Sequence, residues 1–519
     1  MSRSGGIPVV DFFAGPGGLG EGFSALEDRP GRHPFKVALS VEKDAAAHRT
    51  LTLRAFLRRF ARNEVPASYY RYVLGKSSQP WDLASLPEWR EAEREAMLGT
   101  LGEPESDSRV HTRLRELRLQ ERPWVLIGGP PCQAYSLVGR ARNAGNTHYR
   151  PDRDERHFLY RRYLAVLDEY RPPVFVMENV KGILSSTVQG KRIFSRILAD
   201  LSAPSRALGR EGKSSARYRI RAVCEPVLLE SGSDASEIDP NSFVVPSERH
   251  GVPQTRHRVI LVGVLAGIRP KLGCVLAPEE ARLLVSQAIS DLPRLRSGLS
   301  HGADDSGRWA EVIRRAAGKL IPTVNRMGLD RVTNEVERIA RREPESFPKL
   351  RRSGRPPAWR AREEISRFHE WCLDAGLGGT LNHETRLHMR DDLERYLFCA
   401  SFSRAEGRSP RARDFPNRLA PDHASWENGD FADRFHVQGA REVASTITSH
   451  LAKDGHYFIH YDPVQCRSLT VREAARLQTF PDNYFFEGTR TQQYVQVGNA
   501  VPPLLATKLA RIVHAILAG

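Results

Sequence analysis

The sequence predicts an α/β protein with a doubly wound sheet and a second, smaller basic domain. Short apolar runs at residues 7–13, 124–127 and 174–177 end in glycine-rich or polar turns, as buried strands do. Helical patterns lie between several of these runs, as in βαβ units. From about residue 270 to 465 this alternation is lost, and prolines and arginines become frequent.

Length and composition are those of a globular protein with a surplus of cations. A chain of 519 residues is long enough for two or three domains. It has no run of 18 apolar residues and no apolar leader core, and its six cysteines lack metal-ligand spacing. We therefore expect a cytoplasmic protein without disulfides, a metal site or a membrane partner. The net charge of +16 favours a polyanionic partner.

The first unit is a strand at residues 7–13, a glycine turn, and a helix that opens near Phe23. Gly15, Gly17 and Gly20 satisfy G-x-G-x-x-G, so a dinucleotide-binding oxidoreductase has to be weighed. A second strand, residues 37–41, ends at Glu42. A carboxylate at that place can accept the ribose hydroxyls of an adenosine-containing cofactor, although a solvated strand-end carboxylate is the alternative.

The next segment is an insertion. Residues 45–62 look helical and basic, and residues 63–123 are polar and interrupted by prolines, which predicts short helices. The third strand should lie here, but the pattern does not place it. Asp82-Leu83 is the candidate contact for a cofactor adenine.

A single thiol follows the strand at 124–127. Gly129-Pro130-Pro131-Cys132 is a stiff turn, so the backbone sets the direction of the sulfur. Cys132 is either a nucleophile or a buried structural cysteine. Residues 140–162 hold seven arginines against three acids, as expected of a mobile phosphate-attracting loop or of an ordinary solvated one.

Polar groups also end two later segments. After a helix at 158–170, the strand at 174–177 leads into Glu178-Asn179-Val180, where apolar neighbours would partly desolvate the carboxyl group and suit it to donate a proton. Farther on, alternation places Gln254, Arg256 and Arg258 on one face before the strand at 259–264. That face points into the same site or into solvent.

Residues 202–242 look irregular, and residues 270–465 look like a separate basic domain with helical periodicity only at 277–292, 363–374 and 386–400. Residues 349–362 carry six cations and no acid. A second basic cluster lies beside Phe402, Phe415 and Trp426 and consists of Arg404, Arg408, Arg411, Arg413 and Arg418. The alternative is a charged insertion without function. Thr470 and Glu473 then predict a capped helix, and residues 504–517 a closing amphipathic helix.

Together these segments resemble the DNA cytosine-5 methyltransferase family, of the bacterial type associated with restriction-modification or phage defence. Six stretches occur in the family's order: 11–18, 129–133, 178–180, 254–258, 467–482 and 498–503. The resemblance implies a Rossmann-like S-adenosylmethionine-dependent methyltransferase domain at 1–268, with the insertion at about 45–123. It also implies a small target-recognition domain at 269–485 and a segment, 486–519, that returns to the catalytic domain.

The resemblance also implies roles for single residues. Cys132 would attack carbon-6 of a flipped-out cytosine, Glu178 would hold its amine and protonate the ring nitrogen, and Arg258 would contact its carbonyl, with Arg256 also in the catalytic set. S-adenosylmethionine, the methyl donor, would be bound by Asp11, Phe13, Ala14, Gly15, Gly17, Gly18, Glu42, Asn499, Ala500 and Val501. The substrate would be bound by Pro131, Gln133, Ser136, Asn179 and Val180.

The implied substrate is duplex DNA, and we expect a monomer acting alongside a cognate nuclease or defence system. Three alternatives stay open: a tRNA cytosine-5 methyltransferase, a nicotinamide-dependent oxidoreductase and a catalytically silent DNA-binding protein. The long spacer between Glu42 and Cys132 leaves the adenine contact unassigned. No code links residues 270–465 to a target sequence.

Overall fold

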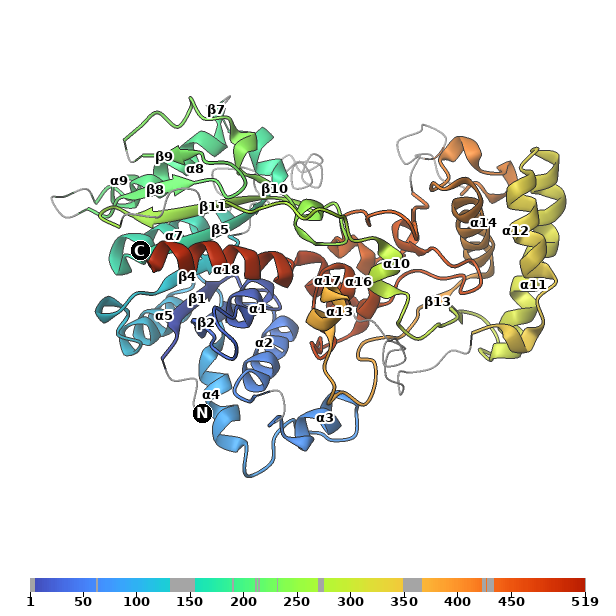
Figure 1. Ribbon diagram of the computed structural model, residues 1–519, viewed down its shortest axis with the longest axis horizontal. Coiled ribbons are helices and arrows are strands. Elements are labelled where there is room, and N and C mark those ends of the chain that lie inside the picture. Colours follow the sequence, from blue (N-terminus) through green and yellow to red (C-terminus); the bar gives the residue numbers. More distant parts are fainter. Residues whose placement is uncertain are drawn as a thin grey trace.

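The computed structural model describes residues 5–61, 64–130, 155–188, 191–210, 212, 215–230, 232–268, 275–348, 366–421, 426 and 434–518. A sheet flanked by helices forms one end of the molecule and a group of helices forms the other, with a compact joining region between them (Figure 1). The first and last elements of the chain, β1 and α18, both belong to the sheet end.

The central sheet has the order β3-β2-β1-β4-β5-β11-β8-β9, and β10 pairs with β11. The first five strands are parallel and β11 is antiparallel to both of its path neighbours. The order reverses direction between β1 and β4, which makes their carboxyl ends the expected ligand crevice. The strands are β1 (Ile7–Phe12), β2 (Phe35–Glu42), β3 (Ala96–Leu98), β4 (Val125–Gly128), β5 (Val174–Val180), β8 (Tyr218–Arg221), β9 (Leu228–Leu229), β10 (Val244–Pro246) and β11 (His257–Leu265).

Both faces of this sheet are covered, as the near-continuous apolar runs of its strands require. Val9, Ile127 and Val176 face α1 (Gly18–Ala25) and α18 (Pro503–Leu517). Val10 and Phe175 face the opposite layer, which contains α5 (Pro104–Glu116), α7 (Glu155–Tyr170), α8 (Ile193–Ser202) and α9 (Pro204–Ala207). The predicted doubly wound α/β fold is therefore confirmed.

The closing helix α18 is a core helix. Residues 490–517 are long and apolar enough to pass a test for a membrane span, but the qualifying stretch is 61% buried within the protein. Gly22 of α1 explains the close packing, because a Cβ atom there would lie 2.3 Å from Cβ of Ala506 and 2.5 Å from the carbonyl oxygen of Pro503. The two helices pack backbone to backbone.

The insertion consists mainly of helices: α2 (Ala45–Leu57), α3 (Ala67–Val73), α4 (Leu86–Glu95) and α5. It also holds the missing third strand, β3, which pairs with β2 up to Glu42. Asp82 accepts the hydroxyl of Ser85 at 2.8 Å, and Leu83 is 90% exposed. Their assignment as the adenine contact stays a prediction.

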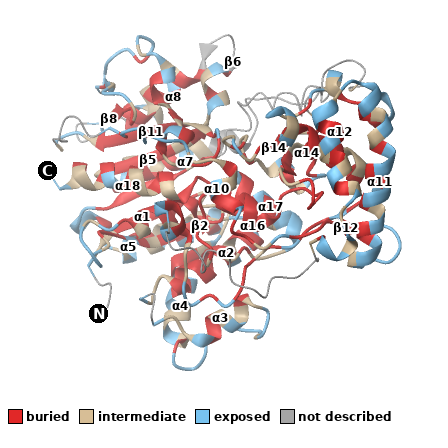
Figure 2. Ribbon diagram, turned by 45° about the vertical axis from the view of Figure 1, so that its right-hand side comes forward, coloured by how far each residue is buried: buried red, intermediate tan, exposed pale blue. Residues whose placement is uncertain are grey.

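The joining region has a core of its own. It combines α10 (Val285–Ile289), α13 (Arg367–Cys372), α16 (Val471–Leu477) and α17 (Arg490–Asn499). Figure 2 shows that burial continues from the sheet through these helices. The predicted domain boundary between residues 485 and 486 runs through this core, because buried residues from both sides of it, between 444 and 500, pack together there.

The small domain is helical. Its core is formed by α11 (Ser306–Arg326), α12 (Asp330–Ala340) and α14 (Arg390–Glu406), joined by short strand pairs. The pairs are β12 (Gly298–Leu299) with β13 (Leu387–His388) and β14 (Val437–Gln438) with β15 (Ile459–His460), while β6 (Thr187–Val188) pairs with β7 (Lys191–Arg192) at the sheet end. The predicted irregularity was wrong for α11 and α12, and also for β8 within 202–242.

Candidate active site

Three chain segments converge at the carboxyl edge of the sheet. Glu178 lies near the end of β5, and β11 runs antiparallel to it with Arg258 opposite Val180. The Nε atom of Arg258 is 3.0 Å from Oε1 of Glu178, and the two side chains are only 12% and 14% exposed. Gly129, after β4, leaves room for this carboxylate, because a Cβ atom there would lie 3.0 Å from Oε2.

The turn that carries Cys132 begins at this place. Asn179 is buried and its amide nitrogen lies 3.5 Å from the carbonyl oxygen of Pro130, two residues before the thiol. The other end of the same amide accepts the Val180 main-chain N–H at 2.8 Å. Asn179 therefore ties the end of β5 to the cysteine turn. The residues predicted on that turn, Pro131, Cys132, Gln133 and Ser136, lie outside the described residues.

The side chains of Gln254 and Arg256 are turned toward the carboxyl-terminal part of the chain. Arg256 is 1% exposed and donates to the carbonyl oxygens of Ile447 at 2.6 Å and Gly498 at 3.0 Å. Gln254 donates to the carbonyl of Leu477 at 2.8 Å. Burial lowers the pKa of Arg256 from its ordinary value. Of the two predicted catalytic arginines, Arg258 therefore meets Glu178, whereas both terminal nitrogens of Arg256 serve main-chain carbonyls.

The glycine turn after β1 is built as a close-approach loop. Phe13, Gly15 and Gly17 have φ of 58°, 57° and 95°, which are left-handed values that side chains rarely adopt. The Gly15 N–H donates to Oε2 of Glu42 at 2.8 Å, and the Asp44 N–H donates to Oε1 at 2.8 Å. Glu42 thus joins the end of β2 to the turn, and the Ala14 N–H donates to the Val41 carbonyl. The ribose contact expected of Glu42 stays a prediction.

The carboxyl-terminal motif closes over this turn. A Cβ atom on Gly18 would lie 2.1 Å from the carbonyl oxygen of Val501, so the two main chains touch. The hydroxyl of Tyr484 donates to the carbonyl oxygen of Pro16, also in the turn. Ala500 is buried and its carbonyl accepts Gln478 at 2.6 Å, while Asn499 is exposed at the end of α17. Segments from opposite ends of the sequence therefore meet at this turn.

Asp11 lies behind the turn rather than at its mouth. Its carboxylate is 1% exposed, accepts no well-formed hydrogen bond from the described residues, and lies next to Gly20 of α1. Burial raises the pKa of Asp11 to about 8. The nearby Gly20 amide and Arg58 lower the pKa, but by less than burial raises it. The direct contact with a cofactor that was expected of Asp11 stays a prediction.

The structure describes only the second of the two predicted basic clusters in the small domain. Residues 349–362 lie outside the described residues, as does most of 140–162. In the second cluster three arginines are paired with acids of the small domain: Arg404 with Glu335 at 3.4 Å, Arg408 with Asp414 at 2.7 Å and Arg418 with Glu394 at 2.5 Å. Arg411 and Arg413 are exposed and, within the described part of the chain, have no ion pair within 4.0 Å.

Sequence reasoning missed Gln478 and Tyr484, which hold the carboxyl-terminal motif and the glycine turn in place. Gln478 is fully buried and its amide also donates to the carbonyl of Val497 at 3.0 Å. Both residues lie next to the capped helix at 471–477, but their partners are distant in sequence. Local patterns therefore carry no signal for these roles.

Comparisons with known proteins agree with the site. The family model for C-5 cytosine-specific DNA methylases matches residues 105–203 and 240–514. Type II methyltransferase M.Bpa9945I of Bacillus paralicheniformis is 31% identical over 98% of this chain and 99% of its own length. M.AgeI of Thalassovita gelatinovora, another Type II methyltransferase, is 27% identical over 75% of this chain and 82% of its own. A crystal structure titled as a DNA modification methyltransferase of an E. coli prophage has a TM-score of 0.53 at 18% identity, covers 99% of this chain and 100% of its own, and shows likeness of fold alone.

Proposed function

Because this chain belongs to the C-5 cytosine-specific DNA methylase family, we propose that the Glu178–Arg258 pair receives the cytosine on which it acts. The chain is a DNA cytosine-5 methyltransferase and uses S-adenosylmethionine as methyl donor. Members of the family flip the target base out of the duplex and attack it with a cysteine. The observation that carries our proposal is the buried ion pair beside the turn that leads to Cys132.

In this proposal the pair binds two edges of one base. The Glu178 carboxyl group takes the exocyclic amine and supplies a proton to the neighbouring ring nitrogen, and the Arg258 guanidinium takes the carbonyl oxygen. Since the two side chains already meet at 3.0 Å with little exposure, they are held in place before the base arrives. Preorganised groups lose little orientation entropy when the substrate binds.

Cys132 is the nucleophile in this proposal. Its thiolate adds to carbon-6 and shifts electron density to carbon-5, which then takes the methyl group; loss of the carbon-5 proton and expulsion of the thiolate restore the ring. Pro131, Gln133 and Ser136 share its turn and contact the substrate. Asn179 and Val180 position the turn through the Pro130 carbonyl.

The residues around the glycine turn fit an adenosine-containing methyl donor. The left-handed Gly15 and Gly17 let main-chain groups approach a ligand, and Glu42 stands at the strand end where ribose hydroxyls are bound. When bound, S-adenosylmethionine supplies an electrophilic methyl group. Phe13, Ala14 and Gly18 line its pocket, Asn499, Ala500 and Val501 close it, and Asp11 supports the turn from behind. Arg256 is a positioning residue that ties the Arg258 strand to Gly498 beside this closure.

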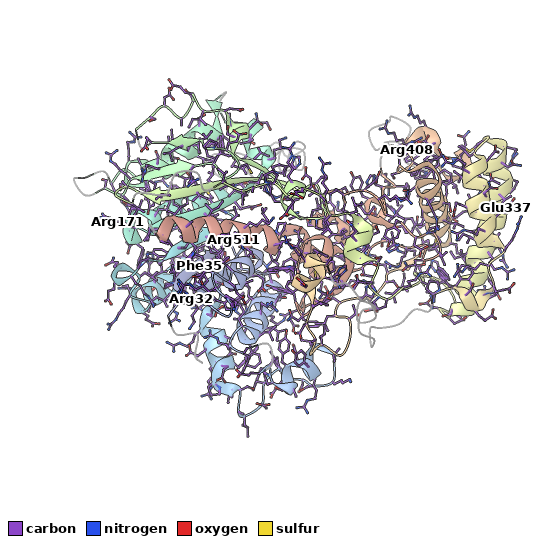
Figure 3. The ribbon with its side chains drawn as sticks, in the orientation of Figure 1. Arg32, Phe35, Arg171, Glu337, Arg408 and Arg511 are labelled. Carbon is purple, nitrogen blue, oxygen red and sulfur yellow. The ribbon has the colours of Figure 1, made fainter. Side chains whose placement is uncertain are left out.

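The remaining assignments concern the whole chain. Residues 1–268 and 486–519 form the catalytic domain. The small domain within 269–485 reads the target in duplex DNA on its side away from α11, with Arg411 and Arg413 available to contact it. Arg408 lies on the side of this domain that faces the sheet domain (Figure 3). The proposal also includes that the protein is a monomer and acts in the cytoplasm beside a cognate nuclease or defence system. The Type II names of the relatives support the link to a nuclease.

The proposal is tested by tritiated methyl transfer to duplex DNA and to tRNA, with bisulfite sequencing of plasmid from an expressing host that has no other methylation. We expect transfer to duplex DNA only. Cys132→Ala should abolish transfer while donor binding, followed by calorimetry, persists. Glu178→Gln should lower kcat by about 10²–10⁴-fold. Glu93→Gln, on the exposed side of α4, is the matched control. Activity of Cys132→Ala, or an unchanged kcat for Glu178→Gln, would refute these roles.

A further inference from the structure

The outer helix of the small domain carries a stripe of cations that the proposed site does not use. Arg308, Arg315, Lys319 and Arg326 are all exposed on α11. At 3.6 residues per turn they lie within about 40° of one another around the helix and extend about 27 Å along it. The opposite face holds the buried residues of the helix, so the stripe points into solvent: Trp309, Ile313, Ala317, Leu320 and Val324.

The neighbouring helix shows what an ordinary charged surface looks like in this domain. On α12 and directly after it, each exposed arginine has an acidic partner: Arg331 with Glu406 at 4.0 Å, Arg338 with Glu335 at 2.9 Å and Arg341 with Glu337 at 2.7 Å. Within the described residues Arg315, Lys319 and Arg326 have no acidic partner within 4.0 Å, and Arg308 has only exposed Glu311 at 3.7 Å. Within the described residues, the charges of Arg315, Lys319 and Arg326 are therefore not neutralised by acidic side chains.

Its position separates it from the active site. Figures 1 and 2 both show α11 at the end of the molecule farthest from the sheet, with α14 and the joining region in between. Beside the cations α11 exposes Gly318, whose Cβ position has no atom within 4 Å, and Pro322, and neither adds a long side chain to this surface. A stripe of this length matches a stretch of duplex that carries roughly 16 phosphates.

We propose that this α11 stripe binds the phosphate backbone of a second segment of duplex DNA while the first segment occupies the active site. The inference rests on the proposed function for one point, namely that the target duplex is bound at the carboxyl edge of the sheet. Contacts to phosphate are independent of sequence, and a second non-specific contact lets an enzyme pass between distant segments of one long molecule.

The test compares two triple variants of equal charge change. Arg315→Gln/Lys319→Gln/Arg326→Gln removes the stripe, and Arg331→Gln/Arg338→Gln/Arg341→Gln removes the paired arginines of α12. Each protein is first saturated with a short duplex that carries the methylation site. A fluorescent, target-free duplex about three helical turns long is then titrated in at several salt concentrations.

We expect the stripe variant to bind the second duplex at least about tenfold more weakly, with a salt slope smaller by about 0.9 for each lost contact. The α12 variant should bind like the wild type, and both should methylate the short duplex at the wild-type rate. Equal binding by the stripe variant, or equal loss in the α12 variant, would overturn the inference. Loss of short-duplex methylation in the stripe variant would also overturn it, by placing the stripe at the target duplex. Failure of the wild type to methylate would refute the proposed function instead.

Discussion

At the scale of single residues, the buried carboxyl group of Asp11 makes the stability of the fold depend on pH. Its pKa is about 8 in the folded protein because of burial, against an ordinary value of 3.8. Between these two pH values the folded state keeps a proton that the unfolded state has lost, so this residue's contribution to stability falls as pH rises from about 4 to 8. One pKa unit corresponds to about 1.4 kcal/mol.

We therefore expect Asp11→Asn, which cannot ionise, to be more stable than the wild type at pH 8 and to lose this advantage toward pH 4. Thermal unfolding across this range measures the effect. Glu93→Gln, which changes an exposed carboxylate in the same way, should follow the wild-type curve. Parallel curves for Asp11→Asn and the wild type would show that Asp11 is not protonated in the fold.

The residue types of the site were readable from the sequence, but several of their partners were not. Glu178 lies near the end of one apolar strand and Arg258 near the start of another. The sheet brings the two side chains together as predicted. Arg256 follows the same alternation, yet its partner Gly498 lies 242 positions away. Alternation fixes which face of a strand a side chain occupies, whereas the atom that it meets there depends on chain segments that fold against that face.

At the scale of elements, the contact between α1 and α18 rests on Gly22. Ala has a better helix propensity than Gly by about 1 kcal/mol, so propensity alone predicts that Gly22→Ala stabilises. The structure predicts the opposite, because the new methyl group would meet Ala506, the Pro503 carbonyl and the Thr507 nitrogen at 2.3–2.6 Å. We expect destabilisation by about 1–3 kcal/mol in urea unfolding.

Gly318→Ala is the control, since nothing lies within 4 Å of its Cβ position in α11. It should stabilise by up to about 1 kcal/mol. A stabilised Gly22→Ala would mean that α18 is not packed on α1 as described.

Strong local signals predicted elements well and weak ones did not. The capping box of Thr470 and Glu473 is present in α16, with N–H to side-chain distances of 3.2 and 2.8 Å. Helix α11 was missed although its buried residues have helical spacing, because several of them are alanines and arginines surround them. The short strands β3 and β8 are specified mainly by the neighbours with which they pair.

At the scale of the whole molecule, the insertion connects the sheet domain with the joining region, a role that its polar sequence did not reveal. Three tyrosine hydroxyls of α3 donate to segments that are distant in the sequence. Tyr69 donates to the Asn483 carbonyl at 3.1 Å, Tyr70 to Asp374 at 3.2 Å and Tyr72 to Glu487 at 2.7 Å. Apolar packing of Phe56 and other α2 side chains with Leu377 and Leu381 reinforces the link. The insertion thus fixes the sheet domain against the joining region.

We expect Tyr70→Phe/Tyr72→Phe to loosen this link without disturbing either core. Each variant side chain keeps its ring but loses a hydrogen bond to a carboxylate, worth about 1.5–3 kcal/mol. Amide hydrogen exchange should therefore quicken at residues 374–381 and 483–487, while exchange in β1, β4 and β5 stays slow. Tyr170→Phe makes the same chemical change at a hydroxyl paired with His111, between α5 and α7, and should leave exchange at 374–381 unaltered. If the double variant exchanges like the wild type, packing alone holds the insertion in place and the tyrosine hydroxyls contribute nothing to the link.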